Sequence, residues 1–187
     1  MPIPGGLNKP VDRTVTINRQ LDHSAHKNSG RLFPLSILAD NIRHAENIGS
    51  LFRLADALGI QHIYLGGESA CPPNPKIRRT SRSTEKSVAY SQHDDAVELA
   101  KALQAKKLLL VALEISTQSL ALSDPAFQQK IKGRELCLVL GSENTGVQNE
   151  LLKLADISVH IPMQGQNSSM NVATAAAIAC YEIIQKL

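Results

Sequence analysis

The sequence predicts an α/β fold, in which a mainly parallel sheet of five or six strands carries helices on both faces. Three observations predict it. Short segments dominated by apolar residues are typical of strands buried on both faces. Stretches with helix signals separate them, as in parallel sheets with helical crossovers. No internal repeat or linker divides the chain, so we expect one α/β domain over residues 35–187 and a basic, irregular extension over residues 1–34.

The strands and helices follow from local patterns. Apolar residues at helical spacing run from Ala45 to Leu58, and Gly59 then supplies a stop signal. Aspartates predict two further helix starts, at Asp94 and Asp95 and at Asp124 before a proline. The predicted strands are 35–39, 62–66, 107–114, 135–141 and 156–162. The other predicted helices are 94–107, 149–154 and 171–186, and a long polar loop with at most a short helix is expected over 67–93.

The composition is that of an ordinary globular domain. Hydrophobic residues make up 43% of the 187 residues and charged residues 20%. Aromatic residues make up only 3% and Trp is absent, so we expect a core of Leu, Ile, Val and Ala. No apolar run approaches the ~20 residues of a membrane helix, and the N-terminal residues lack the apolar segment of a signal peptide. We therefore expect a cytoplasmic protein with no membrane partner.

The three cysteines argue against two kinds of site. Cys71, Cys137 and Cys180 are far apart and form no CxxC pair, which disfavours a zinc site and a disulfide framework. Cys137 and Cys180 lie in apolar segments, so we expect them to be core residues.

Three segments carry residues suited to chemistry, and the first is 40–59. Asn47 and Arg53 lie six residues apart in it, and Asn47 is placed as the N-cap of a helix. Gly49 allows a close approach to the backbone. Taken alone, the segment equally fits a capping asparagine and a solvated arginine.

The second segment, 138–147, follows a buried strand. Gly141, Glu143 and Gly146 come directly after it, where the strand ends of an open α/β sheet bind ligands. The spacing matches neither the dinucleotide-binding fingerprint nor the P-loop, which argues against a nucleotide-dependent dehydrogenase. A plain glycine turn with a surface glutamate is the alternative.

The third segment, 161–182, joins a strand to the last helix through a polar loop. Ser168, Ser169 and Asn171 cluster at the start of that helix, where backbone N–H groups are free. The alternative is a simple capping role. The alanine-rich stretch 173–179 suits either core packing or the close approach of another helix.

In order and spacing, these segments resemble the signature segments of the SpoU/TrmH family of RNA ribose 2′-O-methyltransferases, in the SPOUT superfamily. The matching residues are Asn41, Asn47, Arg53, Gly141, Glu143, Gly146, the run 161–163 and the run 169–172. The resemblance implies a deep C-terminal trefoil knot that holds S-adenosylmethionine. It places the cofactor at Leu113, Leu140, Gly141, Ile161, Met163, Met170 and Val172.

The resemblance also implies roles for polar residues, with no metal. Family members are held to use the residue matching Arg53 as general base, but a guanidinium is always charged, so we expect Arg53 to favour the alkoxide electrostatically. Asn47 would position Arg53 or the RNA, and Glu143 would orient Arg53 or accept a hydrogen bond in the site. Ser169 and Asn171 would shape the loop around substrate and cofactor. Dimers form through the first and last helices, which predicts a homodimer with Arg53 facing the partner's cofactor.

The expected substrate is a structured RNA, with tRNA favoured over ribosomal RNA. The 67–93 segment mixes basic with small hydroxyl residues, which suits phosphate contacts. We place RNA contacts at Arg78, Arg79, Arg82 and Asn41. Because aromatic residues are scarce, stacking on bases is not expected to dominate. A merely solvated loop, and a non-catalytic RNA-binding module of the same fold, are the alternatives.

Overall fold

The computed structural model describes residues 18–20 and 29–187, and Arg31–Leu187 form one compact unit. Most of the predicted extension over residues 1–34 lies outside the described residues. Within the described ranges, no helix is long and apolar enough to cross a membrane. All statements below concern the compact unit.

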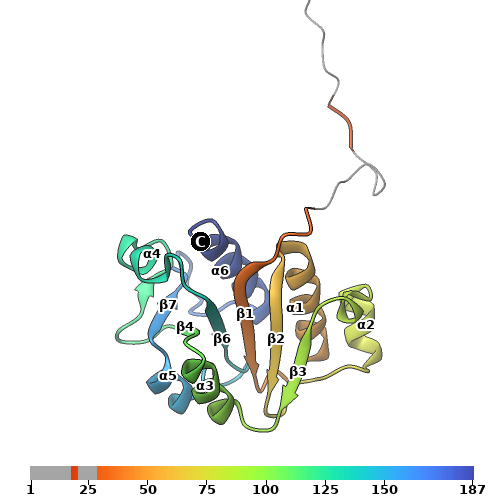
Figure 1. The fold of residues 1–187 in the computed structure, drawn as a ribbon, viewed down its shortest axis with the longest axis horizontal. Coiled ribbons are helices and arrows are strands. Elements are labelled where there is room, and N and C mark those ends of the chain that lie inside the picture. The colour runs from red at the N-terminus through yellow and green to blue at the C-terminus, as the bar shows by residue number, and fades with distance from the viewer. Residues whose placement is uncertain (1–17, 21–28) are drawn as a thin grey trace, which may run out of the picture. The chain divides into compact units, whose positions relative to one another are not determined.

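A parallel sheet forms the centre of this unit (Figure 1). Its strand order is β3-β2-β1-β6-β4-β7-β5, and every neighbouring pair is parallel. The strands are β1 (Phe33–Asp40), β2 (Ile60–Gly66), β3 (Tyr90–His93), β4 (Leu109–Leu113), β5 (Leu120–Ala121), β6 (Leu136–Leu140) and β7 (Ile157–His160). The prediction of a parallel sheet is confirmed.

The predicted count of five or six strands is wrong, because the described part of the chain has seven. The two unpredicted strands, β3 and β5, are the edges of the sheet. The sequence of β3 is YSQH, which is polar because an edge strand is covered less, and β5 has only two residues. Neither carries the apolar run by which buried strands are recognised.

Helices cover both faces of the sheet, as predicted (Figure 1). The helices α1, α2, α4 and α6 supply side chains to one apolar core, and α3 and α5 supply side chains to a second core on the other face. Their bounds are α1 (Ala45–Leu58), α2 (Pro75–Ser81), α3 (Ala96–Ala105), α4 (Pro125–Ile131), α5 (Asn149–Leu154) and α6 (Val172–Ile184), with a 3-10 turn η1 at Thr84–Lys86.

The apolar strands are explained by these two cores. In β6, Leu136, Leu138 and Leu140 face the first core, while Cys137 and Val139 face the second. A central strand therefore needs apolar residues at every position. Cys137 and Cys180 are core residues, as predicted, and burial raises the pKa of each thiol to about 12.

Helix α1 begins before Asn47, the residue predicted to be its N-cap. Its N-cap is His44, and Asn47 lies inside the first turn, so the placement of Asn47 as N-cap is wrong. The backbone of Asn47 is already helical, which leaves its side-chain amide free for tertiary contacts. The stop at Gly59 is confirmed, since this residue adopts φ 67° at the C-cap.

The segment 67–93 is more ordered than predicted. It contains α2, η1 and β3, and α2 packs closely against α1. Gly49 explains the close packing, because a Cβ there would lie 2.8 Å from the Ile77 carbonyl oxygen and 2.8 Å from Thr80 Cβ. The partner that approaches Gly49 is therefore α2 of the same chain.

Candidate active site

The predicted cofactor contacts gather at one edge of the sheet. Leu113, Gly141 and Ile161 stand at or directly after the carboxyl ends of β4, β6 and β7, which are adjacent in the order β6-β4-β7. The carboxyl ends of parallel strands form the usual ligand-binding edge of an α/β sheet. Segments separated by dozens of residues therefore meet at this edge.

A tight turn follows β6. Ser142 and Gly146 exchange backbone hydrogen bonds of 3.1 and 3.0 Å, and the Ser142 and Thr145 hydroxyls lie 2.6 Å apart. A Cβ on Gly141 would overlap the backbone of Gly146 and Val147. Glycine is thus required at 141 for the chain to close on itself, beyond any ligand contact.

Glu114 holds this turn, and the sequence analysis missed it. Its Oε2 accepts a 3.0 Å hydrogen bond from the Val147 amide, and its Oε1 accepts one of 2.9 Å from the Ile115 amide. Oε2 also occupies the space that a Cβ on Gly146 would take. Glu114 therefore ties the end of β4 to the turn after β6. A polar residue at a strand end was the available signal.

The three signature segments meet through hydrogen bonds among Asn47, Glu143 and Asn171. The Asn47 amide nitrogen donates to Glu143 Oε1 at 2.7 Å. The Asn171 amide nitrogen donates to Asn47 Oδ1 at 2.9 Å. Three of the five predicted catalytic residues are thus brought together from segments up to 124 residues apart in the chain.

This chain of hydrogen bonds has one direction, and the start of α6 sets it. Asn171 caps α6, because its Oδ1 accepts from the Ala173 and Thr174 amides at 3.0 and 3.2 Å. Its amide nitrogen must then face Asn47, whose own nitrogen faces the Glu143 carboxylate. Among the described residues, Glu143 Oε2 has no hydrogen-bond partner and is left to accept one from outside the cluster.

Arg53 and Ser169 lie outside this cluster. Arg53 is exposed on α1 and forms no hydrogen bond or ion pair within the described part of the chain. Six residues separate Arg53 from Asn47, which turns the two side chains about 120° apart around a helix. The expected contact of Arg53 with Asn47 or Glu143 does not occur within one chain. Ser169 is exposed in the loop before α6.

The loop 161–170 offers backbone groups for a ligand. Within residues 18–20 and 29–187, no hydrogen bond involves a backbone or side-chain group of this loop. Met163 and Met170 are half-buried in it, Leu140 and Val172 contact the first core, and Ile161 does so as well. Free amides beside half-buried apolar side chains suit a ligand that joins an adenosine to an amino acid. These residues therefore fit S-adenosylmethionine.

Within the described ranges, no three His, Cys, Asp or Glu side chains lie close enough together to hold a metal ion. The residues of the site are carboxylate, amide, hydroxyl and guanidinium groups.

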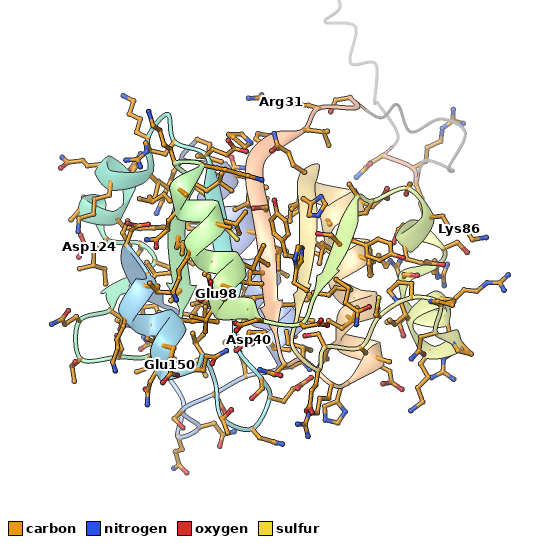
Figure 2. The ribbon with its side chains drawn as sticks, turned by 60° about the horizontal axis from the view of Figure 1, so that its bottom comes forward. Arg31, Asp40, Lys86, Glu98, Asp124 and Glu150 are labelled. Atoms are coloured by element: carbon orange, nitrogen blue, oxygen red, sulfur yellow. The ribbon has the colours of Figure 1, made fainter. Side chains whose placement is uncertain are left out.

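A buried carboxylate adjoins the site. Asp40, at the end of β1, is 1% exposed and accepts hydrogen bonds from Gln148 Nε2 at 3.0 Å and from Asn41 Nδ2 at 2.8 Å (Figure 2). Burial raises the pKa of Asp40 above its ordinary value of 3.8, the two amide hydrogen bonds oppose that rise, and the negative charge of Asp95 adds to it. Asp40 thus ties β1 to the segment that leads into α5.

Asp40 should make stability depend on pH. Because its pKa is higher in the folded state, the folded state binds its proton more tightly, and the stabilisation falls as pH rises above 3.8 through the raised pKa. Asp40→Asn removes this loss, so we expect the variant to gain stability relative to the wild type over that range. Urea unfolding at several pH values measures the difference. Asp94→Asn, at an exposed site, is the control; a pH-independent difference for Asp40→Asn would contradict this account.

Within the described residues, none of the predicted RNA contacts is hydrogen-bonded to Asn47, Glu143 or Asn171. Arg78 and Arg79 are exposed on α2, and Arg82 is exposed at its C-cap. Asn41 uses its amide within the protein: its nitrogen donates to Asp40, and its oxygen accepts from the Glu68 amide at 3.0 Å. An RNA contact at Asn41 stays a prediction.

Comparison with known proteins places this site in a family. The model of the SpoU rRNA methylase family matches residues 34–181, which include the first two signature segments and all but the last residue of the third. The chain belongs to the SpoU rRNA methylase family.

Individual SpoU relatives support the assignment. The 23S rRNA (guanosine(2553)-2′-O)-methyltransferase RlmP of Bacillus subtilis is 31% identical over 79% of this chain and 56% of its own length. The SpoU methyltransferase AviRb of Streptomyces viridochromogenes, solved with AdoMet, has a TM-score of 0.71 and 29% identity over 81% of this chain and 59% of that one. The chain spans about half to three-fifths of the length of the curated relatives it matches.

A third comparison covers nearly the whole length of a solved structure. A solved structure described as giving insight into 2-OH methylation of C/U34 on tRNA has a TM-score of 0.65 and 26% identity. The alignment covers 82% of this chain and 97% of that one.

Proposed function

We propose that this chain transfers a methyl group from S-adenosylmethionine to a ribose 2′-hydroxyl of a structured RNA in the cytoplasm. One observation carries the proposal: Asn47, Glu143 and Asn171 are hydrogen-bonded beside the strand ends where Leu113, Gly141 and Ile161 meet. Family membership and the AdoMet complex of AviRb support the same chemistry. Residues 35–187 would form the methyltransferase domain and residues 1–34 a basic extension.

The residues of this chain would position and activate the hydroxyl. The cofactor, when bound, supplies a methyl group on a positively charged sulfur, which needs no metal activation. Leu140, Met163, Met170 and Val172 would surround it with apolar side chains, while the free backbone of 161–170 donates and accepts hydrogen bonds. The Arg53 guanidinium would stabilise negative charge on the ribose oxygen as the hydroxyl proton passes to solvent water and the oxygen bonds to the methyl carbon, whose bond to sulfur breaks. Glu143 Oε2 is free to accept a hydrogen bond from that arginine.

Arg53 would act on the site of a second copy of the chain. It has no partner within the described part of its own chain, whereas the Glu143 cluster leaves one acceptor free. Helix α6 packs on α1 and exposes Ile178 (42%) and Tyr181 (58%) one turn apart. Exposed apolar side chains on a helix face suit a two-fold interface.

Of the two roles suited to the alanine-rich stretch 173–179, core packing is the one that its buried alanines take. Ala176 and Ala179 are fully buried in the core of their own chain. The exposed interface residues of α6 would therefore be Ile178 and Tyr181, with Thr174 and Gln185 beside them at helical spacing.

Disrupting this face should separate the two subunits. Ile178→Asp combined with Tyr181→Asp would bury two carboxylates from each subunit in the interface. We therefore expect a monomer whose methyl transfer falls at least ~10-fold, because Arg53 no longer reaches a site. Sedimentation velocity measures the state of assembly. Gln128→Asp, exposed on α4, should leave it unchanged. A fully active monomer would rule out the shared site.

The trefoil knot is part of the same proposal. The chain leaves β6 toward α5 on one face of the sheet, and it leaves β7 through 161–171 toward α6 on the other face. Both crossings occur at the carboxyl ends of the strands, and α6 packs on α1 and β6. Threading of 161–187 through the loop after β6 would produce the knot.

We propose tRNA as the substrate, with ribosomal RNA second. The nearly complete match to a chain linked to tRNA methylation supports tRNA, and RlmP supports ribosomal RNA. The test is transfer of tritiated methyl from S-adenosylmethionine to purified tRNA and to ribosomal RNA, both from cells lacking this protein. We expect label in tRNA. Label in ribosomal RNA alone would make ribosomal RNA the substrate in place of tRNA. Label in neither RNA would overturn the proposed activity.

A further inference from the structure

A basic hollow lies beside α1, formed mainly by α2 and η1. It has a volume of about 1170 Å³, and we call it the Tyr90 hollow. Its lining includes Arg78, Arg79, Lys86 and Tyr90. Pockets for small ligands commonly measure about 300–1,000 Å³, so a nucleotide fits this volume.

The charge of the hollow favours an anionic polymer. Arg78, Arg79 and Lys86 are exposed around it, and Figure 2 shows Lys86 on this side of the molecule. Arg79 also lies 3.9 Å from Glu46 at the start of α1, a partner too exposed to neutralise it fully. Glu85 is the acidic residue of the lining, and its carboxylate is bonded to the Ser81 hydroxyl. Three cations exceed what one phosphate of a free nucleotide would pair with.

Tyr90 places an aromatic ring in this basic setting. It is 36% exposed on the edge strand β3, although aromatic residues make up only 3% of the chain. The buried ring of Phe52 packs against it, with ring centroids 5.3 Å apart and planes at 89°. A ring supported from behind and open to solvent among cations suits stacking on a base whose phosphates are held nearby.

The hollow is linked to the helix that carries Arg53. Phe52, which supports Tyr90, directly precedes Arg53. Ser87, which follows the lining residue Lys86, contacts Asp56 one turn further along α1 at 3.4 Å. We infer that the Tyr90 hollow binds an unpaired nucleotide of the RNA substrate, with its base stacked on Tyr90 and its phosphates paired with Arg78, Arg79 and Lys86. The inference rests on the proposed function for the identity of the RNA as substrate.

The consequence is a preference for RNA with an unstacked nucleotide close to the methylated one. Helical RNA keeps its bases stacked, so a duplex would reach the cations but not the ring. Loss of the ring should therefore affect single-stranded RNA selectively, whereas loss of the cations should affect both forms.

The test compares Tyr90→Leu with Tyr90→Phe, which keeps the ring. The binding of each variant and of the wild type is measured without cofactor on two RNAs. One is a short single strand that carries 2-aminopurine, whose fluorescence is quenched by stacking. The other is a blunt duplex of the same sequence. We expect Tyr90→Leu to weaken single-strand binding by about 5- to 150-fold and to abolish quenching, with duplex binding unchanged. Tyr90→Phe should behave as wild type. Replacing Arg78, Arg79 and Lys86 together with alanine should weaken the binding of both RNAs and flatten its salt dependence.

Each other outcome overturns the inference. Unchanged single-strand binding in Tyr90→Leu would exclude the ring as a stacking platform. An equal loss for duplex and single strand, with an unchanged unfolding midpoint, would assign Tyr90 to the shape of the basic surface instead. Since these measurements need no methyl transfer, they stay decisive even if the wild-type protein methylates no RNA, which would defeat the proposed function alone.

Discussion

Arg53→Ala is expected to lower methyl transfer at least ~10²-fold while leaving cofactor affinity unchanged, which is the scale for losing one preorganised electrostatic stabiliser. Arg53 is exposed and unpaired within the described part of its own chain, so its removal should not disturb the fold. Single-turnover methyl transfer and calorimetry with S-adenosylmethionine measure the two quantities.

Arg53→Lys is the matched variant. It keeps the charge but loses the planar fork that can hold the hydroxyl and an adjacent phosphate together, so we expect little rescue. Near-normal turnover in Arg53→Ala would remove Arg53 from the mechanism.

Gly141→Ala is expected to weaken cofactor binding substantially. The added methyl would overlap the backbone of Gly146 and Val147, so the turn must open where Glu114 now ties it to β4. Overpacking of this kind costs about 1–3 kcal/mol, equivalent to about 5- to 150-fold in affinity if the cofactor needs the closed turn.

Calorimetry in metal-free buffer measures this effect. Gly165→Ala is the stability control, because a methyl at Gly165 meets no atom within 4 Å and should leave the unfolding midpoint unchanged. Wild-type affinity in Gly141→Ala would show that the turn does not shape the cofactor site.

The two variants together test the shared site. Mixed subunits of Arg53→Ala and Gly141→Ala can form heterodimers in which one site has both an intact turn and an intact arginine. An equal mixture should therefore recover about a quarter of the wild-type activity if subunits pair at random. No recovery after confirmed exchange of subunits would place Arg53 in the site of its own chain.

Much of the fold could be predicted because the signals are local. Helices α1 and α5 have the predicted bounds, and for α1 apolar residues at helical spacing and the stop at Gly59 define them. The edge strands β3 and β5 could not be predicted in the same way. Their pairing depends on β2 and β7 and not on apolar runs of their own.

The residues of the site could be predicted from the sequence, but the hydrogen bonds among them could not. Resemblance selected Asn47, Glu143 and Asn171, but that they bond to one another depends on a non-local crossing of the chain. Glu114 was not predicted, because a single glutamate after a strand is common. Only the structure shows that its carboxylate accepts a hydrogen bond from the Val147 amide. Tyr90, which we propose to stack on a base, was not predicted, because the scarcity of aromatic residues argued against stacking contacts.

The central claim is that the methyl group reaches a ribose 2′-oxygen of RNA. The direct measurement is alkaline hydrolysis of RNA labelled by the protein with tritiated S-adenosylmethionine, followed by chromatography. A methylated 2′-oxygen cannot attack the neighbouring phosphodiester, so we expect the label in alkali-stable dinucleotides. Label recovered entirely in mononucleotides would indicate base methylation and would contradict the account.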